Sequence, residues 1–153
     1  MPLPRIDYPE AVLSSEMTMA VYELAVEGWS NDLCGHALMV QTSEIERELK
    51  SIRNTGCKIV RPPNTQATFM RAIGVAAVIS RYEFHMINGK KFKTDAARMA
   101  AERKAIDDIA KSLGRSPMWV SAMIRLYREH VIEPARKEIF GGEKTVKQLV
   151  KAA

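Results

Sequence analysis

The chain has 153 residues, of which 46% are hydrophobic and 27% charged, with a net charge of +5 and an isoelectric point near 9.3. This length suits one domain or two very small ones and allows a buried core. No run of about 18 apolar residues occurs and the first ten residues carry no basic-then-apolar signal pattern, so we expect a cytoplasmic protein without a membrane partner. Cys34 and Cys57 alone make neither a disulfide framework nor a structural zinc site, and we expect no metal or cofactor.

Residues Met1–Glu10 include three prolines and are predicted to form an extended arm. A helix then runs from Ser14 or Ser15 to Gly28, with Ser15 as a possible cap. Ser30 can cap a further helix, which carries the apolar residues Leu33, Cys34, Ala37 and Leu38.

The stretch SNDLCGHALMVQTSEIERELKSIR (30–53) has the outline of a helix-turn-helix. A second helix after the turn would place Ile45, Leu49 and Ile52 on one face. However, Met39 stands where glycine is usual, Gly35 stands where alanine is usual, and the second helix displays Glu44, Glu46 and Glu48. Carboxylates facing a phosphate-rich groove are unfavourable. Three alternative roles for this unit therefore remain: it reads bases, it packs within the fold, or it contacts a partner.

This stretch and the following RNTGCKIVRPPNTQATF (53–69) resemble the flagellar master activator subunit FlhC and its relatives on conjugative elements. In that family a unit similar to a helix-turn-helix precedes a proline-containing link and a helical stretch. The matching residues here are Leu38, Ser43, Ile45, Leu49, Arg53, Pro62, Pro63 and Phe69. The resemblance implies a transcriptional activator that works with a second subunit. The family's cysteine-rich zinc region has no counterpart in this chain.

The middle of the chain divides at the paired prolines of Arg61–Thr65, which form a link between residues 1–62 and residues 63–153. Before it, Gly56–Val60 is a possible short strand. After it, a helix from Gln66 to about Met86 is apolar around more than one face, so it is expected to be buried in the core or in a dimer contact. Ile87–Phe92 has the composition of a turn, and Thr94 caps the next helix.

The stretch AIDDIAKSLGRSPMWVSAMIRLY (105–127) predicts two helices separated by one glycine. In the first helix Ile106, Ile109, Ala110 and Leu113 share one face, and Gly114 can take the left-handed conformation that ends a helix. Ser116 can cap the second helix, and Pro117 suits its first position. This is the pattern of a helix-turn-helix, whose second helix lies in the major groove of DNA. The alternative is a helical hairpin that only builds core.

The run IAKSLGRSPMWVS (109–121) also resembles the helix-turn-helix of the ParB and KorB partition and repressor proteins. The resemblance covers roughly 25 residues, and no other hallmark of ParB accompanies it. It implies DNA binding rather than partition. The helix that starts at Pro117 would be the one that reads bases.

The basic charge lies in the second half of the chain, where residues 77–153 contain 16 Lys and Arg against 9 Asp and Glu. Residues 1–76 contain 7 against 9. Basic clusters beside a reading helix suit contacts to phosphates. The expected DNA contacts are therefore the outward residues of the second helix and the flanking basic residues, which are Arg115, Ser116, Met118, Ser121, Ala122, Arg125, Lys90, Lys91, Lys93 and Arg128.

The sequence contains no motif of a catalytic site, so we do not expect an enzyme. It predicts an all-α helical bundle with one or two helix-turn-helix units. The expected function is a sequence-specific transcriptional regulator of bacterial, plasmid or phage type that binds double-stranded DNA near the nucleoid, as a homodimer or with a second regulator subunit. The alternatives are a DNA-packaging component similar to a phage small terminase, and a helical adaptor that binds only protein. A short amphipathic tail is expected at Thr145–Ala153.

Overall fold

The computed structural model of the chain describes residues 3–88 and 90–140. These residues form helices joined by short connections, with no strand among them, so the protein is an all-α bundle as predicted. In chain order the elements are η1 (Glu10–Ser14, a 3-10 helix), α1 (Glu16–Val26), α2 (Asn31–Leu38), α3 (Thr42–Asn54), α4 (Gln66–Ile87), α5 (Asp95–Leu113), α6 (Pro117–Tyr127), η2 (Arg128–Ile132, a π-helical turn) and α7 (Glu133–Phe140).

Helix starts follow the capping residues that the sequence predicts. The side chains of Ser15, Ser30, Thr94 and Ser116 each accept a hydrogen bond from the backbone amide three residues later, at 3.1 to 3.2 Å. Each such cap satisfies one amide that the helix leaves without a partner and contributes about 1 kcal/mol. Local side-chain chemistry therefore sets the beginnings of α1, α2, α5 and α6.

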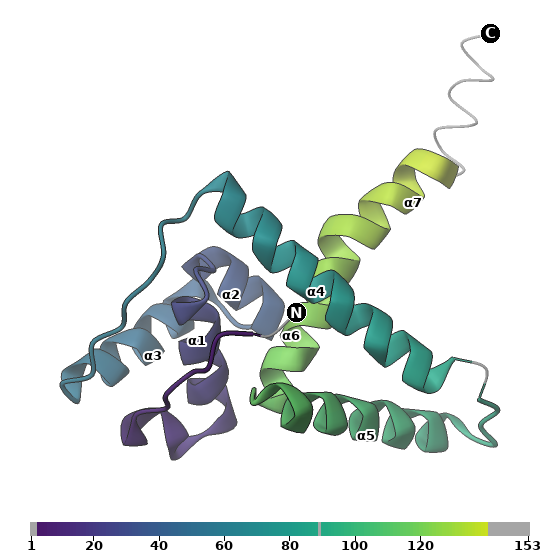
Figure 1. Cartoon of the computed structure of the whole chain (residues 1–153), viewed down its shortest axis with the longest axis horizontal. Coiled ribbons are helices and arrows are strands. Elements are labelled where there is room, and N and C mark those ends of the chain that lie inside the picture. Colours follow the sequence, from purple (N-terminus) through teal and green to yellow (C-terminus); the bar gives the residue numbers. More distant parts are fainter. Residues whose placement is uncertain (1–2, 89, 141–153) are drawn as a thin grey trace, which may run out of the picture.

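Helix α6 forms the centre of the molecule (Figure 1). It contacts α1 and α2 on one side and α4 and α5 on the other. Trp119, Val120, Ala122, Met123 and Leu126 have no exposed surface. One hydrophobic cluster unites side chains of α1 to α6, so the segments before and after the Arg61–Thr65 link share a core.

The chain continues from α6 into α7 through the π-helical turn η2. Pro134 follows this turn, and a proline ring would collide with the carbonyl four residues earlier in a regular α-helix. The widened turn avoids that collision, because the Glu133 amide bonds to the carbonyl of Arg128, five residues back. The predicted tail Thr145–Ala153 lies outside the described residues.

The structure corrects two expectations for the middle of the chain. Gly56–Val60 is not a strand, because no strand lies beside it in the described ranges to complete a ladder, and Ile59 instead packs against the hydrophobic core. Helix α4 is buried in the core of this chain only in part, and the dimer contact expected for it as an alternative stays a prediction. The helix buries Thr68, Ile73, Ala76 and Ile79, whereas its last two turns expose Tyr82 and Phe84 by 63% and 57%.

The exposed end of α4 and the first half of α5 form a protruding pair of helices, the α4–α5 arm (residues 80–104), which is seen at the right of Figure 1. Within its described residues no side chain is buried. None of the described helices is long and apolar enough to cross a membrane.

Candidate nucleic-acid interface

Helix α6, the predicted reading helix, does not present the expected face to solvent. Arg115, Ser116 and Ala122 are only 7%, 3% and 0% exposed, so the prediction that they face outward is wrong. The reason is that α1, α2, α4 and α5 cover the helix on most sides. These three residues cannot reach base edges in this fold.

Arg115 is instead the centre of a buried polar cluster. Its Nε lies 3.1 Å from Glu27 Oε1, and its Nη2 donates to the carbonyl of Pro4 at 2.7 Å. The guanidinium also lies over the ring of Trp119, 5.4 Å from its centroid. Arg115 therefore ties the N-terminal arm and α1 to the turn between α5 and α6.

Glu23 completes this cluster, and sequence reasoning missed it. The carboxylate has no exposed surface and accepts hydrogen bonds from the Tyr8 hydroxyl at 2.7 Å, from the Ser116 amide at 2.8 Å and from the Ser116 hydroxyl. A signal was present, because Glu23 stands inside the apolar run AVYELAV (20–26), where an acid needs buried partners. The buried polar cluster therefore holds parts of the fold together.

The pH dependence of stability should report on this cluster through Glu27. Burial raises the pKa of Glu27 to about 7, and the guanidinium of Arg115 offsets this only in part. In the unfolded chain a glutamate titrates near pH 4.3, so between these values the folded state holds a proton that the unfolded state has lost. The free energy of unfolding contributed by Glu27 is thus fully present below about pH 4.3 and falls as the pH rises to about 7.

Urea unfolding of the natural protein and of Glu27→Gln at several pH values between about 5 and 8 measures this contribution. The difference in unfolding free energy, natural protein minus variant, should decrease with pH up to about 7 and then level off. A difference that stays constant across the range would contradict the assigned role of Glu27.

The remaining predicted contact residues lie in two separate regions. Met118 and Ser121 are half-buried on α6, and Arg125 donates to the carbonyl of Ala37 at the end of α2. Arg128 is exposed. The exposed Lys90, Lys91 and Lys93 lie at the opposite end of α5 from Gly114, about 28 Å away along a helix of 19 residues. The structure therefore does not bring the lysines together with α6.

The turn between α2 and α3 has the same backbone geometry as the turn between α5 and α6. Met39 ends α2 at φ 60° and ψ 40°, and Gly114 ends α5 at φ 66° and ψ 39°. In both places the next helix begins three residues later, at Thr42 and at Pro117. A methionine thus takes the left-handed conformation that usually needs glycine. The turn between α2 and α3 therefore has the backbone form of the predicted helix-turn-helix turn between α5 and α6.

The hydrogen bonds of the two turns also correspond. The Val40 amide donates to the Gly35 carbonyl at 2.9 Å, as the Arg115 amide donates to the Ala110 carbonyl at 3.1 Å. Gly35 takes the place of alanine for a steric reason, since a Cβ there would lie 2.8 Å from the Val40 carbonyl oxygen. The two departures noted in the sequence at Gly35 and Met39 therefore leave the turn intact.

The two units differ in what covers their second helix. Helix α3 buries only Ile45, Leu49 and Ile52, and its remaining side chains are exposed or half-buried. Directly opposite the buried face lies a stripe of exposed polar residues at helical spacing. We call it the α3 stripe, and its members are Ser43, Arg47, Lys50 and Asn54.

The three glutamates of α3 lie beside this stripe. Glu44 lines a groove that also contains Arg125 and Arg128, and Glu46 lines a separate hollow with Arg61. Glu48 accepts a hydrogen bond from the Thr18 hydroxyl at 3.1 Å. Glu44 and Glu46 are thus exposed as the sequence predicts and Glu48 is half-buried, whereas the α3 stripe itself contains no carboxylate.

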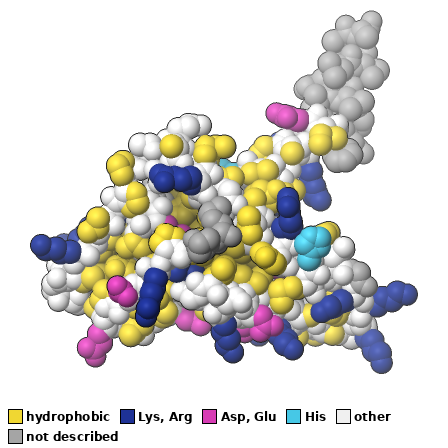
Figure 2. Space-filling view, viewed as in Figure 1, with side chains coloured by type: hydrophobic (Ala, Val, Ile, Leu, Met, Phe, Trp, Pro, Cys, Tyr) yellow, Lys and Arg dark blue, Asp and Glu magenta, His cyan; other side chains and the backbone are white. Residues whose placement is uncertain are grey.

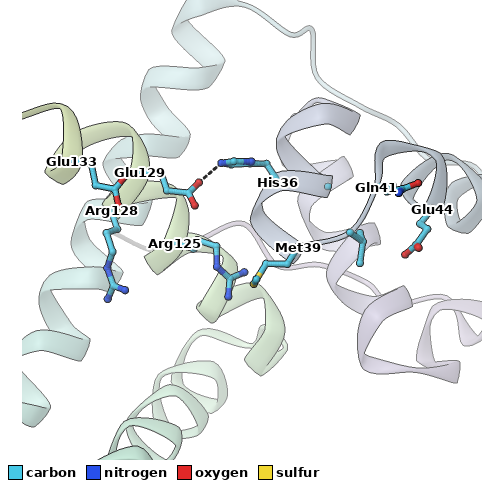
Figure 3. A pocket seen from close by; sticks show the side chains of 10 residues that line it. His36, Met39, Gln41, Glu44, Arg125, Arg128, Glu129 and Glu133 are labelled. Atoms are coloured by element: carbon cyan, nitrogen blue, oxygen red, sulfur yellow. Dashed lines mark ion pairs between the residues drawn. The ribbon is translucent and has the colours of Figure 1, made fainter.

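The groove beside the α2–α3 turn has a volume of about 670 Å³ and lies between this turn and the end of α6 (Figure 3). Figure 3 shows Arg125 and Arg128 pointing to the same side, with the ion pair of His36 and Glu129 across the groove. No side chain caps the first amides of α3, which begins at this groove. Arg125 and Arg128, which were both predicted to contact DNA, thus lie beside the start of α3 and not beside an exposed base-reading surface of α6.

A second basic surface covers the α4–α5 arm. Residues 80–104 contain seven Lys and Arg against three Asp and Glu, giving an excess of four positive charges. Figure 2 shows basic side chains gathered over this end of the molecule at the lower right. Lys90, Lys91 and Lys93 belong to this surface and are all exposed.

The fold and site define an all-α protein with one helix-turn-helix at its centre and a second at its surface. Comparison with protein-family models, with curated proteins and with solved structures found no match to the chain. Within residues 3–88 and 90–140 no cluster of three or more His, Cys, Asp or Glu side chains is arranged to hold a metal ion. Burial raises the pKa of the Cys34 thiol to about 12, which makes it a poor nucleophile.

Proposed function

We propose that the protein binds double-stranded DNA in a sequence-specific way and acts as a transcriptional regulator of bacterial, plasmid or phage type. The observation that carries this proposal is the α2–α3 helix-turn-helix, whose second helix is exposed along its polar face. A helix with an exposed polar face fits the major groove, which is about 12 Å wide. The exposed Arg128 beside α3 and the basic α4–α5 arm supply charge for phosphates.

Binding to duplex DNA should depend on the lysines of the α4–α5 arm. Replacing Lys90, Lys91 and Lys93 together by Gln is expected to weaken binding to all duplexes about equally, because phosphate contacts carry no sequence information. The slope of log affinity against log salt should become shallower by roughly 0.9 for each phosphate that the variant no longer neutralises. Fluorescence anisotropy over a salt series on two unrelated duplexes measures both effects. Weaker binding to only one of the duplexes would contradict the assignment.

A dimer, or a complex with a second regulator subunit, follows from the size of the site. A single α3 spans only about four base pairs, so a useful operator needs a second helix about 34 Å away. Site selection from random duplex DNA should therefore yield two half-sites one helical turn apart. A ring of subunits in sedimentation experiments would favour the packaging component instead.

A protein adaptor is the second candidate, because the α4–α5 arm exposes Tyr82, Phe84 and Met99 by more than half. Large exposed apolar side chains can serve as protein contacts. If the natural protein bound no duplex at low salt, a protein adaptor would be favoured over both the transcriptional regulator and the DNA-packaging component.

A further inference from the structure

We infer that α3, rather than α6, is the helix that reads DNA sequence, and that Arg47 in the α3 stripe recognises guanine in the major groove. This inference rests on the proposed function and assigns the reading site within it. It starts from the two turns of equal geometry, which offer two candidate reading helices. Only one of them stands where a duplex can reach it.

Accessibility decides between the two helices. Helix α6 has its base-reading positions Ser116 and Ala122 buried, and exposing them would require removing the helices that form the core. Helix α3 needs no such change, because each member of its stripe is exposed in the folded protein. A duplex can therefore approach α3 without any rearrangement of the fold.

The chemistry of the α3 stripe fits the edges of bases. Arg47 lies two residues after Ile45, on the side of the helix opposite the core, and its guanidinium can donate two parallel hydrogen bonds to O6 and N7 of guanine. Ser43 lies one turn earlier, and its hydroxyl can form a hydrogen bond with the edge of more than one kind of base. In this motif the N-terminal part of the second helix enters the groove, so Ser43 and Arg47 lie in the part that reaches bases.

The α3 stripe is positively charged, which suits a polyanion, whereas the carboxylates of Glu44, Glu129 and Glu133 line the groove beside it. The stripe carries the two positive charges of Arg47 and Lys50 and no carboxylate, and the exposed Arg128 flanks the start of the helix. No side chain caps the first turn of α3, and the N-terminus of a helix carries partial positive charge. A backbone phosphate beside the α2–α3 turn would be held by Arg128, while Arg47 faces the bases between the two strands.

Two substitutions at Arg47 test the assignment. Arg47→Lys keeps the charge and loses the planar fork that matches guanine, whereas Arg47→Ala loses both. With the full chain and random duplex DNA, the natural protein should select guanine at one position of each half-site. Arg47→Lys should reduce this preference by roughly 5- to 150-fold while its affinity for unrelated duplex changes little.

Matched controls separate α3 from the other basic surfaces. Arg103→Ala removes the same charge from α5 and should leave the selected sequence unchanged, and Ser121→Ala should leave it unchanged if α6 does not read bases. An unaltered guanine preference in Arg47→Lys, a preference abolished in Ser121→Ala, or natural protein that binds duplex without any preference would each overturn the inference. If one of these outcomes occurred but the protein still bound duplex DNA in a salt-dependent way, the proposed function would stand and only the assignment to α3 would fall. If the natural protein bound no duplex DNA, the proposed function itself would fall.

Discussion

At pH 8, where Glu27 is ionised, Arg115→Ala is expected to lower the free energy of unfolding by about 3–5 kcal/mol, the cost typical of removing one partner of a buried ion pair. The side chain of Arg115 is only 2% exposed, and its removal leaves Glu27 without its nearest positive charge. The carbonyl of Pro4 also loses a donor. Urea denaturation followed by circular dichroism measures the change.

The pH dependence of this destabilisation is a second readout. Without Arg115, Glu27 is more easily protonated, and protonation removes the buried charge. The destabilisation should therefore be smaller near pH 6 than near pH 8. The control is Arg98→Ala, because Arg98 pairs with Glu102 on the exposed side of α5 and such pairs contribute about 0–1 kcal/mol. Equal effects of the two substitutions would show that Arg115 is not part of the core.

Trp119→Ala is expected to cost about 3–5 kcal/mol, because it empties the space of the largest fully buried side chain. Trp119 lies on α6, where α1, α2, α4 and α5 meet. Thermal unfolding, followed by far-ultraviolet circular dichroism, should show a large decrease in the midpoint temperature.

Phe84→Ala is the matched control for Trp119→Ala. Phe84 is also aromatic but is 57% exposed on the α4–α5 arm, so its removal should change the unfolding free energy by no more than about 0.5 kcal/mol. If Trp119 were exposed to solvent as Phe84 is, the effect of Trp119→Ala would be as small as that of Phe84→Ala. That outcome would reject the central position of α6.

The sequence predicted local structure well because capping and turn chemistry act over a few residues. Ser116, Pro117 and Gly114 correctly placed the turn between α5 and α6. These signals describe how the backbone turns and contain no information about what covers the helix that follows. Exposure depends on packing between residues far apart in sequence, and Arg115 illustrates this, since its partners are Glu27 and Pro4.

Helix composition did contain a signal about burial. In α6 only Ser121 and Arg125 interrupt an otherwise apolar or aromatic helix, and a helix that is apolar all round is usually buried. In α3 the apolar residues are limited to one narrow face, which is typical of a surface helix. Comparing the two compositions would have reversed the expected roles of α3 and α6. The turn at Met39 could not be foreseen in the same way, because its left-handed backbone is unusual for methionine.

The bonds between the N-terminal arm and the turn before α6 have a consequence for the order of folding. The Tyr8 hydroxyl lies 2.9 Å from the carbonyl oxygen of Gly114, and Arg115 donates to the carbonyl of Pro4, across 106 and 111 residues of chain. During synthesis α1, α2 and α3 therefore emerge long before the helix on which they pack. Closing so large a loop costs chain entropy before any packing can stabilise it, so assembly of this core should be slow compared with formation of its helices. Until α6 emerges, the apolar faces of the first three helices remain open to chaperones.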